Sequence, residues 1–188
     1  MTSEAPVNVA DVRIGGSRIV LEPHHCFACG TLNVHGLGLE LHASDDRCWT
    51  ELVLPERFQG WEGMTHGGIV CTILDEVMAW ALVDHDLWGV TARMTVEFKR
   101  PVPLGRLIRG EGRVVQARRR LVDAEGVILD PADGAILARA EATFVGASEE
   151  KKRELKARYG FGVVSGGAAG SGSTDQEAGS PDSVDVGR

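Results

Sequence analysis

The chain contains 188 residues, of which 43% are hydrophobic and 25% charged, as is typical of a globular protein. This length favours a single domain with a hydrophobic core. Asp and Glu outnumber Lys and Arg by 27 to 20, and the resulting net charge of -7 argues against a nucleic-acid partner. Residues 1–6 lack the pattern of a secretion signal, and no apolar run is long enough to cross a membrane, so we expect a cytoplasmic protein without a membrane partner.

Composition divides the chain into four predicted parts. Residues 1–20 form an N-terminal segment, 21–147 the main domain, and 148–164 a segment with a short helix for which Ser148 is a candidate cap. From 165 to 188 the sequence is rich in Gly, Ala, Ser, Asp and Glu and has almost no bulky apolar residues. That composition predicts a disordered tail.

The main domain has predicted strands on both sides of one apolar helix. The longest apolar stretch, 69–83, is long enough for a buried helix. Residues 90–98 alternate as in a half-buried strand, with Ala92 and Met94 on one face and Thr91 on the other. Further strands are predicted at 36–41, 48–54, 107–116, 119–129 and 135–145. This order predicts an α+β fold in which an antiparallel sheet wraps around one long central helix.

Two adjacent acids, Asp75 and Glu76, interrupt the predicted helix. An unpaired charge is costly in an apolar helix, and neighbouring residues point about 100° apart, so only one acid should face a pocket. Asp75 lies on the side with small residues, whereas the side of Glu76 carries bulky ones such as Trp80. We therefore predict that Asp75 is the chemical group and that Glu76 pairs with a cation such as Arg93. The alternative is that both acids form ion pairs at an oligomer interface.

The predicted helix opens at His66, Gly67 and Gly68, with Thr65 as a candidate cap. The N–H groups of a first helical turn stabilise negative charge, so an oxyanion could bind at the two glycines. The glycines could equally serve only a tight turn. His66 is a candidate for orienting a substrate, although a lone histidine beside a turn is more often structural.

Three segments together resemble the PaaI-type hotdog thioesterases, and the likeness covers about residues 26–145. They are the run from His66 to Asp75, the triplet Val90-Thr91-Ala92, and the run from Lys99 to Leu104. The resemblance implies that 21–147 is a hotdog domain. It also implies homodimers that join two sheets edge to edge, or dimers of dimers, with active sites at the dimer interface.

The same resemblance implies a role for each candidate residue. Asp75 would act as nucleophile or as general base on water. The N–H groups of Gly67 and Gly68 would polarise the thioester carbonyl. A hydroxyl from Thr91 of the partner subunit would hold the water or the carboxylate. These roles agree with the needs of acyl transfer, which are a carboxylate and preorganised donors.

The four cysteines, Cys26, Cys29, Cys48 and Cys71, are expected to be free thiols. Cys26 and Cys29 form a CxxC pair close to His24 and could bind zinc. A structural zinc site usually has a second ligand pair at regular spacing, and no second CxxC follows. We therefore expect a packed turn beside the acyl pocket and no bound metal. A redox pair is less expected still, since no βαβ context surrounds it.

The predicted function is hydrolysis of an acyl-CoA to a carboxylic acid and free CoA, with no cofactor besides the CoA of the substrate. Lys99 and Arg100 are candidate contacts for CoA phosphates, although they could be ordinary solvated charges at a strand end. A non-catalytic acyl-CoA binding or sensing module with the same fold is the alternative. A hotdog dehydratase or hydratase is a third reading. Asp75 in the expected position disfavours both.

Overall fold

The computed structural model describes residues 12–14, 17–20, 22–44, 47–160 and 162–164. The predicted tail, 165–188, and part of the predicted N-terminal segment lie outside these residues. The strands are β1 (Val12–Ile14), β2 (Ser17–Val20), β3 (His42–Ser44), β4 (Arg47–Val53), β5 (Gly89–Phe98), β6 (Leu107–Arg118), β7 (Leu121–Asp130), β8 (Ala135–Gly146) and β9 (Gly162–Val164). The helices are α1 (Gly67–Ala81), α2 (Glu149–Arg158) and the short 3-10 helices η1 (Glu56–Phe58) and η2 (Leu82–His85). Among the described helices, none combines the length and apolarity needed to cross a membrane.

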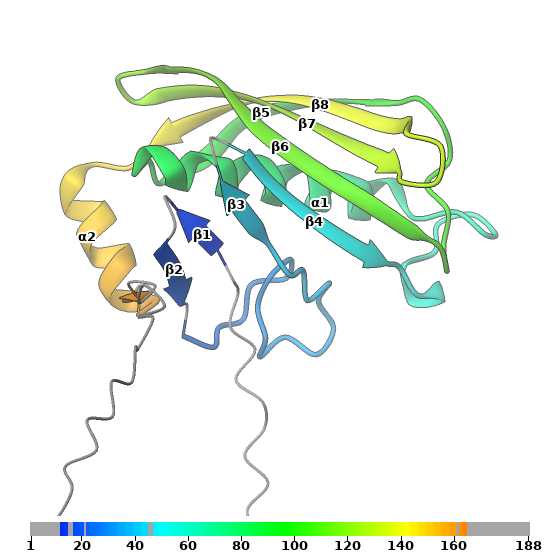
Figure 1. Ribbon diagram of the computed structural model, residues 1–188, viewed down its shortest axis with the longest axis horizontal. Coiled ribbons are helices and arrows are strands. Elements are labelled where there is room, and N and C mark those ends of the chain that lie inside the picture. Colours follow the sequence, from blue (N-terminus) through cyan, green and yellow to red (C-terminus); the bar gives the residue numbers. More distant parts are fainter. Residues whose placement is uncertain (1–11, 15–16, 21, 45–46, 161, 165–188) are drawn as a thin grey trace, which may run out of the picture.

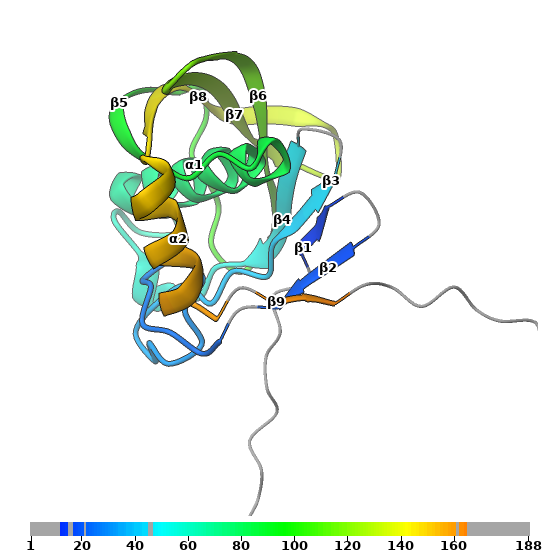
Figure 2. The same cartoon turned by 90° about the vertical axis from the view of Figure 1, so that its left-hand side faces the viewer.

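Six strands form one antiparallel sheet in the order β3-β4-β6-β7-β8-β5. The sheet curls over α1, which lies along its concave face (Figures 1 and 2). Strand β5 pairs with β8 on one side only, so it is an edge of the sheet. The predicted α+β fold, an antiparallel sheet wrapped around one long helix, is confirmed.

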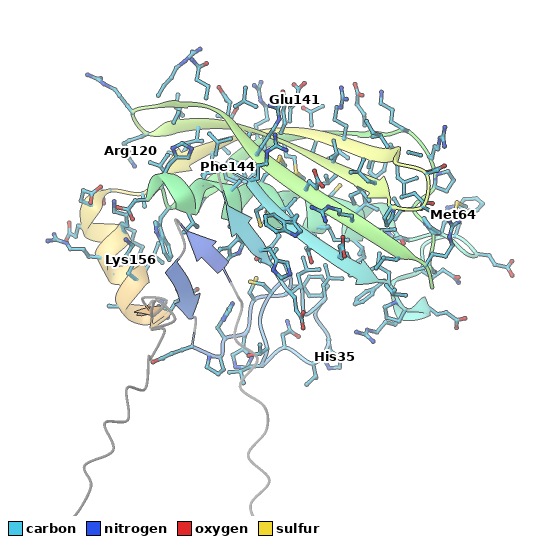
Figure 3. All side chains as sticks on the ribbon, viewed as in Figure 1. His35, Met64, Arg120, Glu141, Phe144 and Lys156 are labelled. Carbon is cyan, nitrogen blue, oxygen red and sulfur yellow. The ribbon has the colours of Figure 1, made fainter. Side chains whose placement is uncertain are left out.

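Helix α1 forms because its apolar residues repeat at helical spacing, and these residues face the sheet. Its fully buried side chains are Val70, Ile73, Leu74, Val77, Met78 and Ala81. Phe144 of β8 lies between sheet and helix, whereas Glu141 lies on the outer side of the sheet (Figure 3). At Gly112 of β6 an added Cβ would lie 2.4 Å from the backbone oxygen of Val77, so only glycine allows helix and sheet to approach this closely.

Two predicted details were wrong. Helix α1 begins at Gly67, within the predicted start at His66-Gly67-Gly68, but it is capped by His66 and not by Thr65, whose hydroxyl is 3.5 Å from the carbonyl oxygen of Pro103. Residues 36–41 are not a strand, and the strand that pairs with β4 is β3, at His42–Ser44. The alternation that suggested a strand at 36–41 instead reflects a loop whose apolar residues, such as Leu39 and Leu41, are buried in the core.

The two ends of the described chain meet in a small second sheet that the sequence did not suggest. Its strand order is β1-β2-β9, all antiparallel. Helix α2 precedes β9 and lies in the segment for which a short helix was predicted; the Ser148 hydroxyl accepts a hydrogen bond from the Lys151 N–H at 3.3 Å. Figure 2 shows α2 at one end of α1, with the loop between β2 and β3 beneath both.

Candidate active site

Asp75 and Thr91 meet on the open side of α1, which is the side that faces the edge strand β5. Asp75 is half-buried on α1, and the Thr91 hydroxyl of β5 donates a hydrogen bond of 2.5 Å to its Oδ1. Both residues belong to the same chain. The structure therefore differs from the expectation that a partner subunit delivers this hydroxyl. A carboxylate that accepts from a neighbouring hydroxyl is held in one orientation, as a positioned base or nucleophile requires.

A β-bulge in β5 turns Thr91 toward the helix. Thr91 pairs with Phe144 of β8 and Arg93 pairs with Thr143, so Ala92 is the extra residue. Directly paired residues lie on the same face of a sheet, and Phe144 is buried beneath the sheet. Thr91 therefore shares the inner face with Met94, which pairs with Ala142. The predicted strict alternation placed Thr91 and Met94 on opposite faces, and the bulge is the reason it was wrong.

The first turn of α1 offers one backbone donor rather than two. The ring Nδ1 of His66 accepts the Gly68 N–H at 3.0 Å, and the His66 carbonyl accepts from Ile69 and Val70. The Gly67 N–H has no partner among the described residues. His66 thus caps the helix, and Gly67 is the candidate oxyanion donor that the local geometry leaves open.

Gly67 opens onto a groove of about 510 Å³ at the start of α1. The groove combines aromatic and basic side chains, among them Trp61, Phe98, Lys99 and Arg100. Lys99 forms an exposed ion pair with Glu97 at 2.5 Å. Arg100 is exposed, and its backbone N–H is bonded to the Leu137 carbonyl. A groove of this kind can hold an apolar group beside an anion.

Asp75 does not line this groove. Asp75 is eight positions after Gly67 on the helix, which corresponds to about 12 Å of rise. One carbonyl group cannot contact both positions of the same chain. The structure brings Asp75 together with Thr91, and Gly67 together with Lys99 and Arg100, but it does not join the two groups.

Glu76 faces a different part of the molecule from Asp75. Its Oε1 accepts a 2.9 Å hydrogen bond from the Trp80 indole, one helical turn further on. Burial raises the pKa of Glu76 to about 7. The predicted pairing with a cation such as Arg93 is not found in the part of the chain that the structure describes; the partners are the indole and the thiol of Cys29.

The thiols beside Glu76 belong to the CxxC pair. One ligand atom each from Cys26, Cys29 and Glu76 lies within 4.8 Å of the others. The Cys29 thiol holds the pKa of Cys26 low, at about 5, whereas the nearby Cys26 sulfur and burial raise the pKa of Cys29. The His24 Nε2 lies 3.5 Å from the Cys29 sulfur. The turn is packed on α1, and the sequence did not indicate that Glu76 would join it.

Comparisons with known proteins agree with this fold. Residues 62–137 match the family model of the thioesterase superfamily. No match was found among curated proteins. The confirmed hotdog arrangement therefore rests on this family model and on solved structures.

Three solved structures illustrate the likeness. A protein described as a thioesterase superfamily protein has 28% identity and a TM-score of 0.61, over 64% of this chain and 63% of that one. The E. coli PaaI protein has 16% identity and a TM-score of 0.56, over 60% and 81% of the two chains. A Streptococcus mutans protein bound to acetyl CoA has 16% identity and a TM-score of 0.53, over 55% and 83%. This chain spans 63% of the first protein, less than two thirds of its length.

Proposed function

Because residues 62–137 belong to the thioesterase superfamily and the fold is PaaI-like, we propose that this protein hydrolyses an acyl-CoA to a carboxylic acid and free CoA. The observation that carries the proposal is the 2.5 Å hydrogen bond between the Thr91 hydroxyl and Asp75 on the open side of α1. It supplies an accessible, oriented carboxylate, which is the group that thioester hydrolysis needs most.

Asp75 acts on the thioester in one of two ways. As a general base, it takes a proton from water while the water oxygen attacks the carbonyl carbon. The C–S bond then breaks, and CoA leaves as a thiolate that takes up a proton. As a nucleophile, its own oxygen attacks the carbonyl carbon, the C–S bond breaks and CoA leaves as a thiolate that takes up a proton. Water then hydrolyses the resulting anhydride, which releases the carboxylic acid and restores Asp75. Thr91 bonds Oδ1, so we assign the reaction to Oδ2.

The developing oxyanion would be held by the N–H of Gly67. This donor lies at the positive end of the α1 dipole and opens onto the groove. Gly68 takes a supporting role, because its N–H holds the His66 ring in place. His66 in turn caps the helix and keeps the first turn in position, so we assign it to the architecture of the oxyanion site.

A second copy of the chain is needed to bring the two halves of the site together. Within one chain Asp75 and Gly67 are about 12 Å apart along the helix, too far for one carbonyl. Strand β5, which carries Thr91, is an unpaired sheet edge, and its Val90 and Phe98 are 72% and 56% exposed. Such an edge is suited to pairing with another strand. In a homodimer formed there, Asp75 of one protomer would face Gly67 of its partner.

The choice of CoA as leaving group rests on the basic side of the groove. Arg100, and Lys99 beyond its ion pair with Glu97, lie where phosphates could bind next to Gly67. The Streptococcus mutans protein with this fold was solved with acetyl CoA, so the fold is compatible with a CoA ligand. A CoA thioester is also consistent with the cytoplasmic location expected from the sequence.

The test is release of free thiol from a panel of acyl-CoAs that differ in chain length and aromatic character. We expect turnover by the wild-type protein and a decrease in kcat of about 100-fold or more for Asp75→Asn, which removes the base but keeps the shape. A wild type that binds acyl-CoAs without turnover would identify a binding module instead.

The matched control is Asp123→Asn. Asp123 also accepts a threonine hydroxyl, from Thr143 at 2.8 Å, but on the outer face of the sheet. Activity should survive in this variant. Equal losses in the two variants would mean that Asp75 matters for stability and not for the reaction.

A further inference from the structure

The loop between β2 and β3 folds a tight turn against α1, and that turn presents two sulfur atoms at one point. Gly30 closes it, because an added Cβ there would lie 2.3 Å from the Cys26 backbone nitrogen. The backbone N–H groups of Ala28 and Cys29 are hydrogen-bonded to the Cys26 sulfur. In Figure 3, the label on His35, at the outer end of the same loop, marks how far the loop extends below α1.

One oxygen donor and one nitrogen donor from outside the CxxC pair lie close to the sulfur atoms. The carboxylate of Glu76 comes from α1, and its closest ligand atom and the two sulfurs all lie within 4.8 Å of one another. The His24 Nε2 lies 3.5 Å from the Cys29 sulfur. In a tetrahedral zinc site with ligand bonds of about 2.0 to 2.3 Å, neighbouring ligand atoms are about 3.5 to 3.8 Å apart. Side-chain movements of about an ångström would therefore bring Cys26, Cys29 and Glu76 to ligand spacing, whereas the His24 ring, whose Nε2 lies outside this group of atoms, must move further to complete the site.

The donor groups are oriented as metal ligands usually are. The Nδ1 of His24 lies 3.0 Å from the Glu22 carbonyl oxygen, which can only accept, so Nδ1 carries the proton and Nε2 offers its lone pair. The Trp80 indole fixes one oxygen of Glu76 at 2.9 Å. Both contacts are the outer interactions that hold ligands in place around bound metals.

From this geometry we propose that His24, Cys26, Cys29 and Glu76 bind a structural zinc ion that fastens the turn to α1. Two thiolates, an imidazole and a carboxylate form a donor set that suits Zn²⁺. The ion also neutralises three acidic groups that crowd together in a partly buried space. The site replaces the earlier expectation of a metal-free packed turn.

The zinc ion is structural because it lies away from the reacting carboxylate. Glu76 follows Asp75 directly, but its side chain points about 100° around the helix. An apolar cavity of about 210 Å³ lies beside the cluster, lined by Cys26, Cys29, Trp80 and Tyr159 among others. Zinc at this point would hold the cavity wall and α1 together.

The first experiment measures metal content in the full-length, untagged protein, produced in zinc-supplemented medium and purified under reducing conditions without chelators. We expect about one zinc ion per chain. Cys29→Ser should lose the ion, whereas Cys71→Ser, which changes a thiol on α1 outside the cluster, should keep it. Metal-free wild type, or equal zinc content in both variants, overturns the proposal.

The second experiment needs no variant that risks misfolding. Wild-type protein stripped of metal is titrated with Co²⁺ alone, and we expect the thiolate charge-transfer band and the intense visible bands of tetrahedral cobalt. Glu76→Gln, which keeps the shape of the side chain, should weaken Co²⁺ binding by about 10-fold or more. Absence of these bands, or a Cys26–Cys29 disulfide in the reduced preparation, contradicts a metal site.

Metal removal gives a third readout, independent of enzymatic activity. A strong chelator should lower the Tm of the wild type by about 5 °C or more, since the ion binds the folded state. The Tm of Cys29→Ser should not respond to the chelator. A wild-type Tm that is insensitive to chelation would argue that the cluster binds no ion.

Discussion

The two sides of α1 use the same chemical group for different purposes. On one side Asp75 faces the sheet edge β5, where the Thr91 hydroxyl holds it near solvent. On the other side Glu76 faces the loop between β2 and β3, where an indole and two thiols surround it. Adjacent helix positions point about 100° apart, so two neighbouring acids reach separate surroundings.

The difference shows that the element facing each acid, and not the acid itself, decides what a carboxylate on α1 does. An accessible carboxylate with a hydroxyl donor can take part in a reaction. Burial raises the pKa of Glu76 to about 7, so the carboxylate beside the thiols favours binding a proton or a cation more than an ordinary glutamate does. The two sides should therefore respond differently to substitution, except where a change displaces the helix itself.

The largest effect is expected from Gly112→Ala, which should disturb both sides together. The added Cβ would lie 2.4 Å from the Val77 backbone oxygen, so α1 must move away from the sheet. We expect a loss of about 3 kcal/mol in the free energy of unfolding, measured by urea denaturation. In Gly146→Ala the nearest atom is 3.4 Å away, and the loss should stay below about 1 kcal/mol. Equal stability of both variants would contradict the close approach of α1 to β6 at Gly112.

Thr91→Val should affect the Asp75 side alone. It removes the 2.5 Å hydrogen bond but keeps the side-chain volume. We expect kcat to fall by about 10- to 100-fold, which corresponds to about 1.4 to 2.7 kcal/mol, with unchanged metal content. The control is Thr143→Val, which loses a similar 2.8 Å bond to Asp123 on the outer face. A similar fall in kcat for both variants would show that the hydrogen bond from Thr91 has no specific role in the reaction.

Substitution of the basic groove residues should change binding more than the chemical step. For Arg100→Ala we expect KM for an acyl-CoA to rise about 3- to 10-fold with kcat nearly unchanged, because phosphate contacts are made equally before and during reaction. Lys99→Ala should have less effect, since Lys99 is already paired with Glu97. Arg153→Ala, an exposed change on α2, is the control.

A shortened substrate separates the two explanations of a raised KM. An acyl thioester of N-acetylcysteamine has no phosphates, so Arg100→Ala should leave its hydrolysis unaffected. If Arg100→Ala raises KM for this substrate as much as it does for the acyl-CoA, Arg100 shapes the groove instead of binding phosphate.

Periodic features of this molecule could be predicted from the sequence, and single-residue irregularities could not. Strands β6, β7 and β8 were predicted within a few residues, because alternating burial repeats along them. The bulge at Ala92 has no sequence pattern, yet it decides which face Thr91 takes. His66 was missed as the cap because Ser, Thr, Asp and Asn are the usual capping residues.

The Glu76 cluster was missed for a different reason. A spacing rule can find Cys26 and Cys29, but Glu76 lies far along the chain and reaches them only after α1 packs against the loop. The available signal was Glu76 followed four residues later by Trp80, on a helix with no cation at that spacing. It indicated a buried carboxylate with a neutral partner.

The smallest effect is expected at Asp86, which anchors α2 near the end of α1. Lys152 and Lys156 donate to its carboxylate at 2.8 and 2.6 Å and hold its pKa below the usual range. Its side chain is 61% exposed, so Asp86→Asn should cost only about 0.5 kcal/mol at neutral pH. Because the folded pKa is the lower one, this contribution is present above the unfolded pKa of about 3.9 and is lost as pH falls through the folded value.

Wild type and Asp86→Asn should therefore converge in stability in acid, while Glu40→Gln, an exposed control, matches the wild type throughout. Asn also tolerates the left-handed backbone of this position, where φ is 52°, so the variant tests the charge alone.

Tyr159 ends α2 and contacts the His24 ring edge-on. Asp86→Asn weakens the attachment of α2, which lies on the Glu76 side of α1. The variant should therefore lower zinc retention slightly while kcat stays constant. A change in kcat without a change in zinc retention would show that the two sides of α1 are coupled through the helix.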